Sequence, residues 1–231
     1  MLKQMELKRD YGGMRSAIPV VIGYIPIGFA YGVLGAANGL TVMEVVSLSL
    51  FVYAGSAQFI AINLLSTGVD IVTIVSTIFI VNLRHLLYST SLSSYMKKIE
   101  HHHIPLLSFF ITDETYAVSV TDFQNGRKPD SAYFYQLFLT SYTAWVISSL
   151  AGALSERLLM TSGLNWGLDY ALPAMYIALL FMQLVGIKKF IVAAFSGALS
   201  IALIYLIPGN FNVIIAALSG AFMGVMLEKW I

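Results

Sequence analysis

Long hydrophobic runs alternate with short polar connections along the whole chain. A helix that crosses the hydrocarbon core of a bilayer needs about 17 to 25 mostly apolar residues. We expect transmembrane helices in eight stretches: residues 17–37, 43–66, 70–93, 104–121, 131–154, 168–187, 189–207 and 211–227. The stretch 104–121 is short and carries two acidic residues, so it would either span the bilayer or re-enter it. The pattern predicts an all-α polytopic membrane protein with seven or eight transmembrane helices.

The composition excludes a soluble protein. Hydrophobic residues make up 58% of the 231 positions and charged residues only 11%, which is less than half the share in soluble domains. The chain has no cysteine, which excludes disulfides and thiolate metal sites, and it has no basic run that would indicate nucleic acid. The partners expected from composition are therefore the lipid bilayer and no nucleic acid. We expect residues 1–231 to form a single transmembrane domain, with residues 1–16 as a cytoplasmic segment.

Basic residues in the connections predict the orientation, because lysine and arginine are enriched on the cytoplasmic side. With eight spans, one side holds Lys3, Lys8, Arg9, Arg15, Arg127, Lys128, Lys188, Lys189 and Lys229, and the other holds Lys97, Lys98 and Arg157. This bias of nine against three places both termini in the cytoplasm.

Two hydrophobic runs contain residues that would interrupt a helix. The stretch "GYIPIGFAYG" (23–32) carries Pro26 and Gly28, and "YAGSAQF" (53–59) carries Gly55, Ser56 and Gln58. Proline removes a backbone donor and clashes with the preceding turn. Freed backbone groups persist in a membrane only where protein or a cavity surrounds them. For either stretch alone, a simple kink or close helix packing explains the pattern equally well.

Ionisable residues lie inside two of the runs. "NLRHLLYST" (82–90) places Arg84 and His85 in one run, and "TDETY" (112–116) places Asp113 and Glu114 in the next. A charge at the bilayer centre costs about 2.5 to 3.5 kcal/mol on insertion scales, so such residues usually serve a function.

Helical periodicity arranges these groups on a polar face. Arg84, Tyr88 and Ser91 would form one stripe, and Asn82, His85 and Ser89 a neighbouring one. The two carboxylates lie about 100° apart on a helix, so at most one would meet Arg84 directly. The interpretation that favours function is a transport site for a zwitterion, in which Arg84 meets a carboxylate and an acid meets an ammonium. The alternative is a buried ion pair that only fixes helix packing.

Three other features allow further interpretations. "HHH" (101–103) is expected to be a solvated loop, because adjacent residues do not converge on one metal ion. Ser56 and His85 could form the dyad of an intramembrane hydrolase, although "AGSAQF" lacks the GxSG setting of such enzymes. Gly220 and Gly224 lie four residues apart on the last helix, a spacing that allows close packing inside the chain or against a partner subunit.

Taken together, "GYIPIGFAYG", "YAGSAQF", "NLRHLLYSTSL" and "TDETYA", in this order and spacing, resemble the AzlC family, the large subunit of branched-chain amino-acid exporters. The resemblance covers about residues 14–228. It implies a transporter of a prokaryotic inner membrane that exports leucine, isoleucine, valine and similar amino acids. It also implies energy from the proton-motive force and a small membrane partner, AzlD. A channel or a carrier for another small solute is the alternative within transport.

The site residues are predicted from burial and spacing rather than from the resemblance. Those expected to bind or pass substrate are Tyr24, Pro26, Gly28, Gly55, Ser56, Gln58, Asn82 and Arg84. Those expected to bind the ammonium or carry a proton are His85, Asp113 and Glu114, and those expected to face the partner are Gly220 and Gly224. We expect no catalytic residue, no metal and no cofactor.

Overall fold

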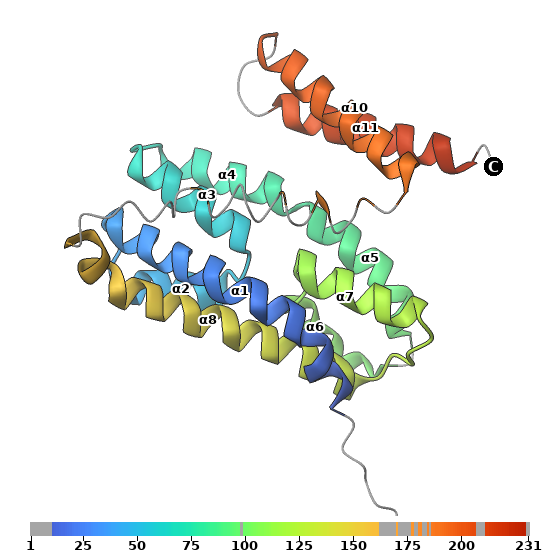
Figure 1. Cartoon of the computed structure of the whole chain (residues 1–231), viewed down its shortest axis with the longest axis horizontal. Helices are drawn as coiled ribbons and strands as arrows, with labels where there is room; N and C mark the ends of the chain where they lie inside the picture. Colours follow the sequence, from blue (N-terminus) through green and yellow to red (C-terminus); the bar gives the residue numbers. More distant parts are fainter. Residues whose placement is uncertain are drawn as a thin grey trace, which may run out of the picture. The chain divides into compact units, whose positions relative to one another are not determined.

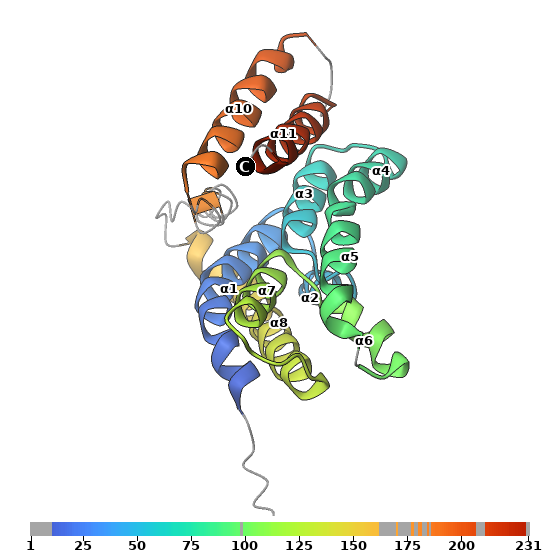
Figure 2. The ribbon, with the colours of Figure 1, turned by 90° about the vertical axis from the view of Figure 1, so that its right-hand side faces the viewer.

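The computed structural model describes residues 11–97, 99–161, 170, 177, 180–181, 184, 186–206 and 211–229. Every regular element among these residues is a helix, which confirms the predicted fold class (Figures 1 and 2). Contacts divide the chain into two units, Met1–Met175 and Tyr176–Ile231, which are described separately.

The helices follow the predicted segments closely. The first unit contains α1 (Gly12–Ala37), α2 (Val42–Phe51), α3 (Gly55–Ser66), α4 (Ile71–Asn82), α5 (Arg84–Met96), the short 3₁₀ helix η1 (His101–His103), α6 (Ile104–Phe109), α7 (Asp113–Gln124) and α8 (Ser131–Thr161). The second contains α10 (Ile187–Ile204) and α11 (Phe211–Lys229). Within the described part of the chain, four helical stretches are long and apolar enough to cross a membrane: Gly12–Ala37, Ile71–Met96, Ser131–Leu159 and Ile187–Ile204. The predicted segment 168–187 lies largely outside the described residues.

Only one of the two predicted helix interruptions is present in the structure. The break expected in "YAGSAQF" is present, because residues 52–54 separate α2 from α3. The break expected at Pro26 is wrong, since α1 runs through 23–32 without interruption. Ser148 Oγ of the neighbouring helix lies 3.2 Å from the carbonyl of Tyr24, two residues before this proline, and shares its proton with the Ala144 carbonyl of its own helix at 2.7 Å. Side chains of adjacent helices commonly support prolines in this way inside membranes.

Two further interruptions were not predicted. Leu83 separates α4 from α5, and residues 110–112 separate α6 from α7. Helix α7, which follows the second interruption, begins with a capping box. Thr112 Oγ1 accepts a hydrogen bond from the backbone N–H of Thr115, and the Thr115 side chain accepts one from the backbone N–H of Thr112. A residue that caps in both directions satisfies donors that the bilayer would leave unpaired.

Helices α1 and α8 pack side by side and in parallel (Figures 1 and 2). Gly13, near the start of α1, lies against Tyr133 near the start of α8, whereas Gly32 lies against Ser149 further along both helices. A methyl group on Gly32 would come within 2.1 Å of the Ser149 carbonyl oxygen. The glycines therefore allow the two backbones to approach closely, as small residues do in membrane helix pairs.

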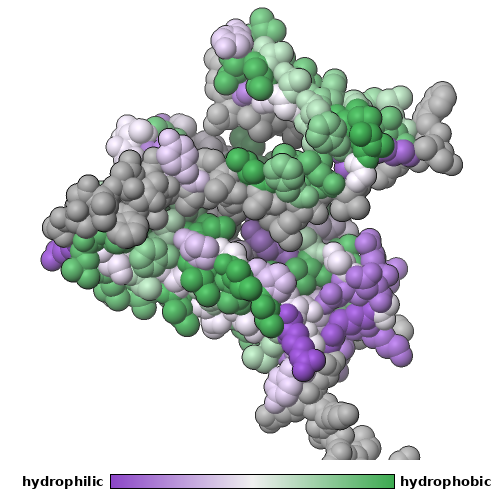
Figure 3. Space-filling view, in the orientation of Figure 1, coloured by the Kyte–Doolittle hydropathy of each residue, from purple (hydrophilic) through white to green (hydrophobic). Residues whose placement is uncertain are grey.

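Polar contacts join the elements at the end of this unit where α1 begins. Asp122 accepts hydrogen bonds from Ser16 Oγ of α1 and from the Tyr133 hydroxyl of α8, the latter at 2.7 Å. The Arg127 guanidinium lies 4.4 Å from the centre of the Tyr133 ring. Figure 3 shows polar surface gathered at this end, whereas hydrophobic surface covers much of the length of α1 and α8.

In the second unit, α10 and α11 pack against each other. Gly220 faces α10 so closely that a methyl group on it would overlap Ser196 Oγ at 1.9 Å. Gly220 therefore packs inside the pair, which is the alternative that its spacing also allowed, and its role at a partner interface stays a prediction. A methyl group on Gly224 would meet only Val192 at 3.8 Å, which is ordinary contact.

The close approach of α1 and α8 leads to a prediction about stability. Gly152→Ala would place a methyl group 2.0 Å from the Phe29 carbonyl oxygen, so it should lower the free energy of unfolding by about 1 to 3 kcal/mol, as overpacking usually does. Gly23→Ala on α1 is the matched control, because a methyl group there meets nothing within 4 Å. Thermal unfolding in detergent measures both variants. Equal melting temperatures for the two would contradict the close packing of α1 and α8.

Candidate functional site

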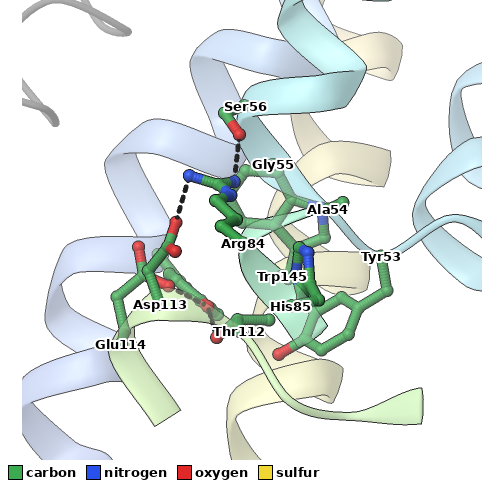
Figure 4. Close-up of a pocket in the computed structure, with 11 residues that line it drawn as sticks. Tyr53, Ala54, Gly55, Ser56, Arg84, His85, Thr112, Asp113, Glu114 and Trp145 are labelled. Carbon is green, nitrogen blue, oxygen red and sulfur yellow. Dashed lines mark hydrogen bonds and ion pairs between the residues drawn. The ribbon is translucent and has the colours of Figure 1, made fainter. Parts of the chain in front are cut away.

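Three helices begin at one small cavity in the first unit (Figure 4). Helices α3, α5 and α7 each contribute residues from their first turn, while α1 and α8 each contribute one aromatic side chain. The lining residues are Tyr24, Tyr53, Ala54, Gly55, Ser56, Arg84, His85, Thr112, Asp113, Glu114 and Trp145. The structure therefore brings together seven of the predicted site residues: Tyr24, Gly55, Ser56, Arg84, His85, Asp113 and Glu114.

An ion pair between α5 and α7 dominates the cavity. Arg84 Nη1 lies 2.8 Å from Asp113 Oδ2, and Arg84 Nη2 donates to Ser56 Oγ of α3. The Arg84 side chain is 23% exposed and that of Asp113 only 10%, so both charges depend on each other for solvation. Arg84 Nε and Asp113 Oδ1 have no partner among the described residues. The pair thus retains one free donor and one free acceptor.

The second carboxylate is held separately from Arg84. The Tyr24 hydroxyl of α1 donates to Glu114 Oε2 at 2.7 Å and lies 2.7 Å from Thr112 Oγ1. Glu114 also lies in the first turn of α7, where the helix dipole stabilises negative charge. One acid therefore meets the arginine and the other meets a phenol, which matches the geometry expected of adjacent residues on a helix.

His85 lies on the cavity wall beside Arg84. Its Nδ1 donates to the backbone carbonyl of Asn82 at 3.0 Å, which directs the proton to Nδ1 and leaves Nε2 as an acceptor. Asn82 itself does not line the cavity, and its Oδ1 is buried without a partner among the described residues. Of the predicted stripe Asn82, His85 and Ser89, His85 therefore lines the cavity and Asn82 lies next to it.

The stripe that starts at Arg84 faces α7, as a polar face inside a membrane requires. The ring of Tyr88 stacks on Tyr116 with centroids 4.7 Å apart, and the Tyr116 hydroxyl donates to Ser91 Oγ at 3.0 Å. These contacts fix the register of α5 against α7, and therefore the position of Arg84 opposite Asp113.

Besides Asn82, three further predicted residues do not line the cavity. Pro26 is exposed on α1, and Gly28 lies against Ser148 of α8, where a methyl group would approach Ser148 Oγ to 2.2 Å. Gln58 belongs to a buried hydrogen-bond network that also contains Ser49, Ser149 and Trp145. One of these residues faces outward and two are used in helix packing, so none of the three lines the closed cavity and their roles in transport stay predictions.

Gln58 nevertheless acts on the cavity indirectly. Its Oε1 accepts from Trp145 Nε1 at 2.9 Å, and its Nε2 donates to Ser49 Oγ at 3.2 Å. The indole held in this way forms one wall of the cavity and lies against Gly55, where a methyl group would come within 2.8 Å of the ring. Gln58 is therefore a positioning residue for Trp145.

Sequence reasoning missed Tyr53, Thr112 and Trp145 as lining residues. Thr112 carried a usable signal, because "TDETY" reads as a helix cap followed by acids. Tyr53 and Trp145 carried none, since an aromatic residue in a hydrophobic run is usually ordinary packing.

The cavity has a volume of about 10 Å³, which is roughly the space that one water molecule requires. An amino acid cannot enter it without a movement of the surrounding side chains or helices. The structure therefore represents a closed state of this site.

The histidine tract forms a short turn rather than an extended loop. Ligand atoms of Glu100, His102 and His103 lie within 4.8 Å of one another, although two of these residues are exposed. His103 Nδ1 lies 2.9 Å from the Tyr135 hydroxyl. Exposed groups of this kind commonly stand together without an ion, so the cluster is not part of the site.

Comparison with known proteins identifies the family. The family model described as AzlC protein matches residues 19–159. The chain belongs to the AzlC family. It is 33% identical over 215 residues to an uncharacterized membrane protein of Archaeoglobus fulgidus, an alignment that covers 91% of this chain and 92% of the relative.

Two named relatives are more distant. The inner membrane protein YgaZ of Escherichia coli is 29% identical over 217 residues, covering 93% of this chain and 80% of the relative. The branched-chain amino acid transport protein AzlC of Bacillus subtilis is 25% identical over 209 residues, covering 90% and 80%. No solved structure matches the chain.

The part matched by the AzlC family model contains the whole cavity. Its lining residues extend from Tyr24 to Trp145, within the matched range 19–159. The second unit lies outside this range. The region that the family model matches is therefore the helix assembly that surrounds the Arg84–Asp113 pair.

The arrangement does not favour a hydrolase in this AzlC member. Ser56 Oγ accepts from Arg84, and the His85 Nδ1 proton is directed to the Asn82 carbonyl. No hydrogen bond joins Ser56 to His85 among the described side chains, although such a bond defines a nucleophile–base dyad. The site is built around a charge pair rather than an activated hydroxyl.

Proposed function

We propose that this protein is the large subunit of a two-component secondary transporter, which exports branched-chain and similar hydrophobic amino acids using the proton-motive force. The observation that carries the proposal is the Arg84–Asp113 pair, which lies in a closed cavity between interrupted helices. Intramembrane ionisable groups and broken helices are the usual elements of substrate and ion sites in transporters. The printed name of the Bacillus subtilis relative supports the choice of substrate.

The proposed mechanism is an exchange of charge partners. Arg84 binds the substrate carboxylate, because a guanidinium matches a carboxylate with two parallel hydrogen bonds. Asp113 or Glu114 meets the ammonium or carries the coupling proton, and His85 is placed to pass a proton. Since the cavity is closed in this structure, transport requires a second conformation in which Arg84 and Asp113 separate.

The parallel packing of α1 and α8 supports the proposed topology. An odd number of crossings must lie between two parallel spans. The three intervening segments, 43–66, 70–93 and 104–121, supply that number if each crosses once. This argument favours a spanning segment at 104–121. With eight spans both termini lie on the same side, which the bias of basic residues places in the cytoplasm, and the relative in Escherichia coli supports an inner membrane of a prokaryote.

Reporter fusions at both termini test the topology. The bias of nine basic residues against three predicts that an alkaline phosphatase fusion at either end is inactive, whereas a green fluorescent protein fusion at either end is fluorescent. Opposite results at the two ends would mean that one of the eight predicted segments does not span.

The role of Arg84 is tested by neutralising the pair. Arg84→Gln should abolish leucine export from proteoliposomes, because loss of one partner from a buried charge pair costs about 2 to 5 kcal/mol. This cost corresponds to roughly 30-fold to several-thousand-fold in affinity. Arg84→Lys should fail similarly, since lysine lacks the bidentate geometry.

The double variant Arg84→Gln with Asp113→Asn separates binding from packing. It removes both charges of the pair, so folding should recover, as judged by melting temperature and gel filtration. We expect it to remain inactive, because no guanidinium is left for the substrate. Recovered leucine export in this variant would show that the pair only holds α5 and α7 together.

The proposed partner is the small membrane subunit AzlD, which would dock within the bilayer on α11. Gly224→Leu should reduce the amount of AzlD that co-purifies, because a larger side chain would separate the two surfaces. Since a methyl group on Gly224 also meets Val192 of α10 at 3.8 Å, the melting temperature is measured alongside to show that the α10–α11 pair stays folded. Gly197→Leu on α10 is the control, since a methyl group there meets nothing within 4 Å. An intact complex with Gly224→Leu would exclude this face as the docking site.

A further inference from the structure

Helix α3 begins at the cavity without a cap. Its N-cap residue, Ala54, makes no side-chain hydrogen bond, and the backbone N–H groups of Gly55, Ser56 and Ala57 have no acceptor among the described residues. The start of α7 differs, because Thr112 caps it. An uncapped helix start carries unsatisfied donors and a partial positive charge, both of which suit an anion.

Tyr53 supplies a second, independent indication of a ligand. Its side chain is 3% exposed and lines the cavity, yet its hydroxyl has no hydrogen-bond partner within the described part of the chain. Figure 4 shows the ring directed in among the other lining side chains. A buried hydroxyl without a partner is unfavourable by about 1 to 3 kcal/mol, so its persistence calls for a function.

The backbone at Tyr53 creates this arrangement. Tyr53 is the only non-glycine residue with a positive φ, 36°, among the described residues. Its ring is held in place by Tyr142, at a centroid distance of 4.9 Å, and by Phe109 and Phe110, both at 6.4 Å. Strained residues of this kind concentrate at ligand sites, where the surrounding packing maintains them.

Most of the free groups around the cavity can act as donors, namely the first N–H groups of α3, the Tyr53 hydroxyl and Arg84 Nε. The free acceptor among the described lining side chains is Asp113 Oδ1, which remains for an ammonium. A carboxylate accepts several such bonds at once, whereas an ammonium accepts none. We propose that Tyr53 and the start of α3 form the carboxylate subsite for the transported amino acid, next to Arg84. This inference rests on the proposed function and adds a residue that substrate recognition requires.

The proposal predicts opposite effects of one substitution on stability and on binding. Tyr53→Phe keeps the ring packing and removes only the hydroxyl. Without ligand, the melting temperature should stay the same or rise, because the buried unpartnered group is gone. The stabilisation by saturating L-leucine should decrease, because one hydrogen bond to the carboxylate is lost.

Isothermal titration of the full chain with its partner subunit in lipid nanodiscs tests the subsite with three ligands. L-leucine carries both charges, 4-methylpentanoate carries only the carboxylate, and 3-methylbutylamine carries only the ammonium. Tyr53→Phe should weaken binding of the two carboxylates about 10-fold to 100-fold, the range for a hydrogen bond to a charged group, and leave the amine unchanged. Tyr31→Phe is the matched control, because that hydroxyl is equally buried but donates to the Val45 carbonyl outside the cavity.

Each outcome decides the proposal. An equal loss for all three ligands would assign Tyr53 to packing, and no loss for the carboxylates would exclude it from the subsite. If 3-methylbutylamine binds neither the wild type nor Tyr53→Phe, the proposal is decided by comparing the affinities of Tyr53→Phe and Tyr31→Phe for the two carboxylates. If the wild type binds neither carboxylate, the subsite is wrong. If 4-methylpentanoate binds through Tyr53 but leucine does not bind, the subsite stands and the proposed function fails.

Discussion

The ion pair between Arg84 and Asp113 is the interaction around which the first unit is organised. A guanidinium in a hydrophobic run can remain charged only if a partner solvates it. Asp113 supplies that partner at 2.8 Å, and Ser56 supplies a further acceptor on a third helix. The pair therefore ties α3, α5 and α7 to one point, and the breaks that precede these helices lie beside it.

The same constraint explains how the surrounding helices are packed. Backbone groups freed at a break must find partners within the protein, because hydrocarbon offers none. Glycines on α1 and α8 allow these helices to approach closely, and a network through Gln58 holds Trp145 over the break after α2. Close packing on this side gives the cavity rigid walls, so that any movement of the site falls on the interrupted helices.

The sequence predicted the features that depend on hydropathy and local spacing. The limits of the helices were predicted closely where the chain is described, because runs of about 20 apolar residues leave few alternatives. The meeting of Arg84 with one acid but not both followed from helical periodicity. Features that depend on contacts between residues far apart in the sequence could not be predicted. Pro26 looked like a break but is tolerated beside Ser148, more than a hundred positions away.

The break between α2 and α3 shows most clearly what the sequence could not predict. Tyr53 adopts a positive φ that nothing in its residue type favours, and the aromatic rings that hold it come from α6 and α8. Gln58 was predicted to line the cavity because its partner Trp145 lies on α8, far away in the sequence, and could not be recognised from local spacing. The sequence alone gave no means of distinguishing an amide that lines a cavity from one that closes a buried network.

The charge content of the closed cavity bears on which ligand it would accept. Arg84 and Asp113 compensate each other, so an entering ion of one sign would leave one member of the pair without a partner. A zwitterion avoids this penalty, because its carboxylate replaces Asp113 on Arg84 while its ammonium replaces Arg84 on Asp113. A ligand with an additional anionic side chain would bring a third charge that both Asp113 and Glu114 oppose. In the closed state, the two side chains of the pair therefore carry the same two charges as the neutral amino acid that we propose binds between them.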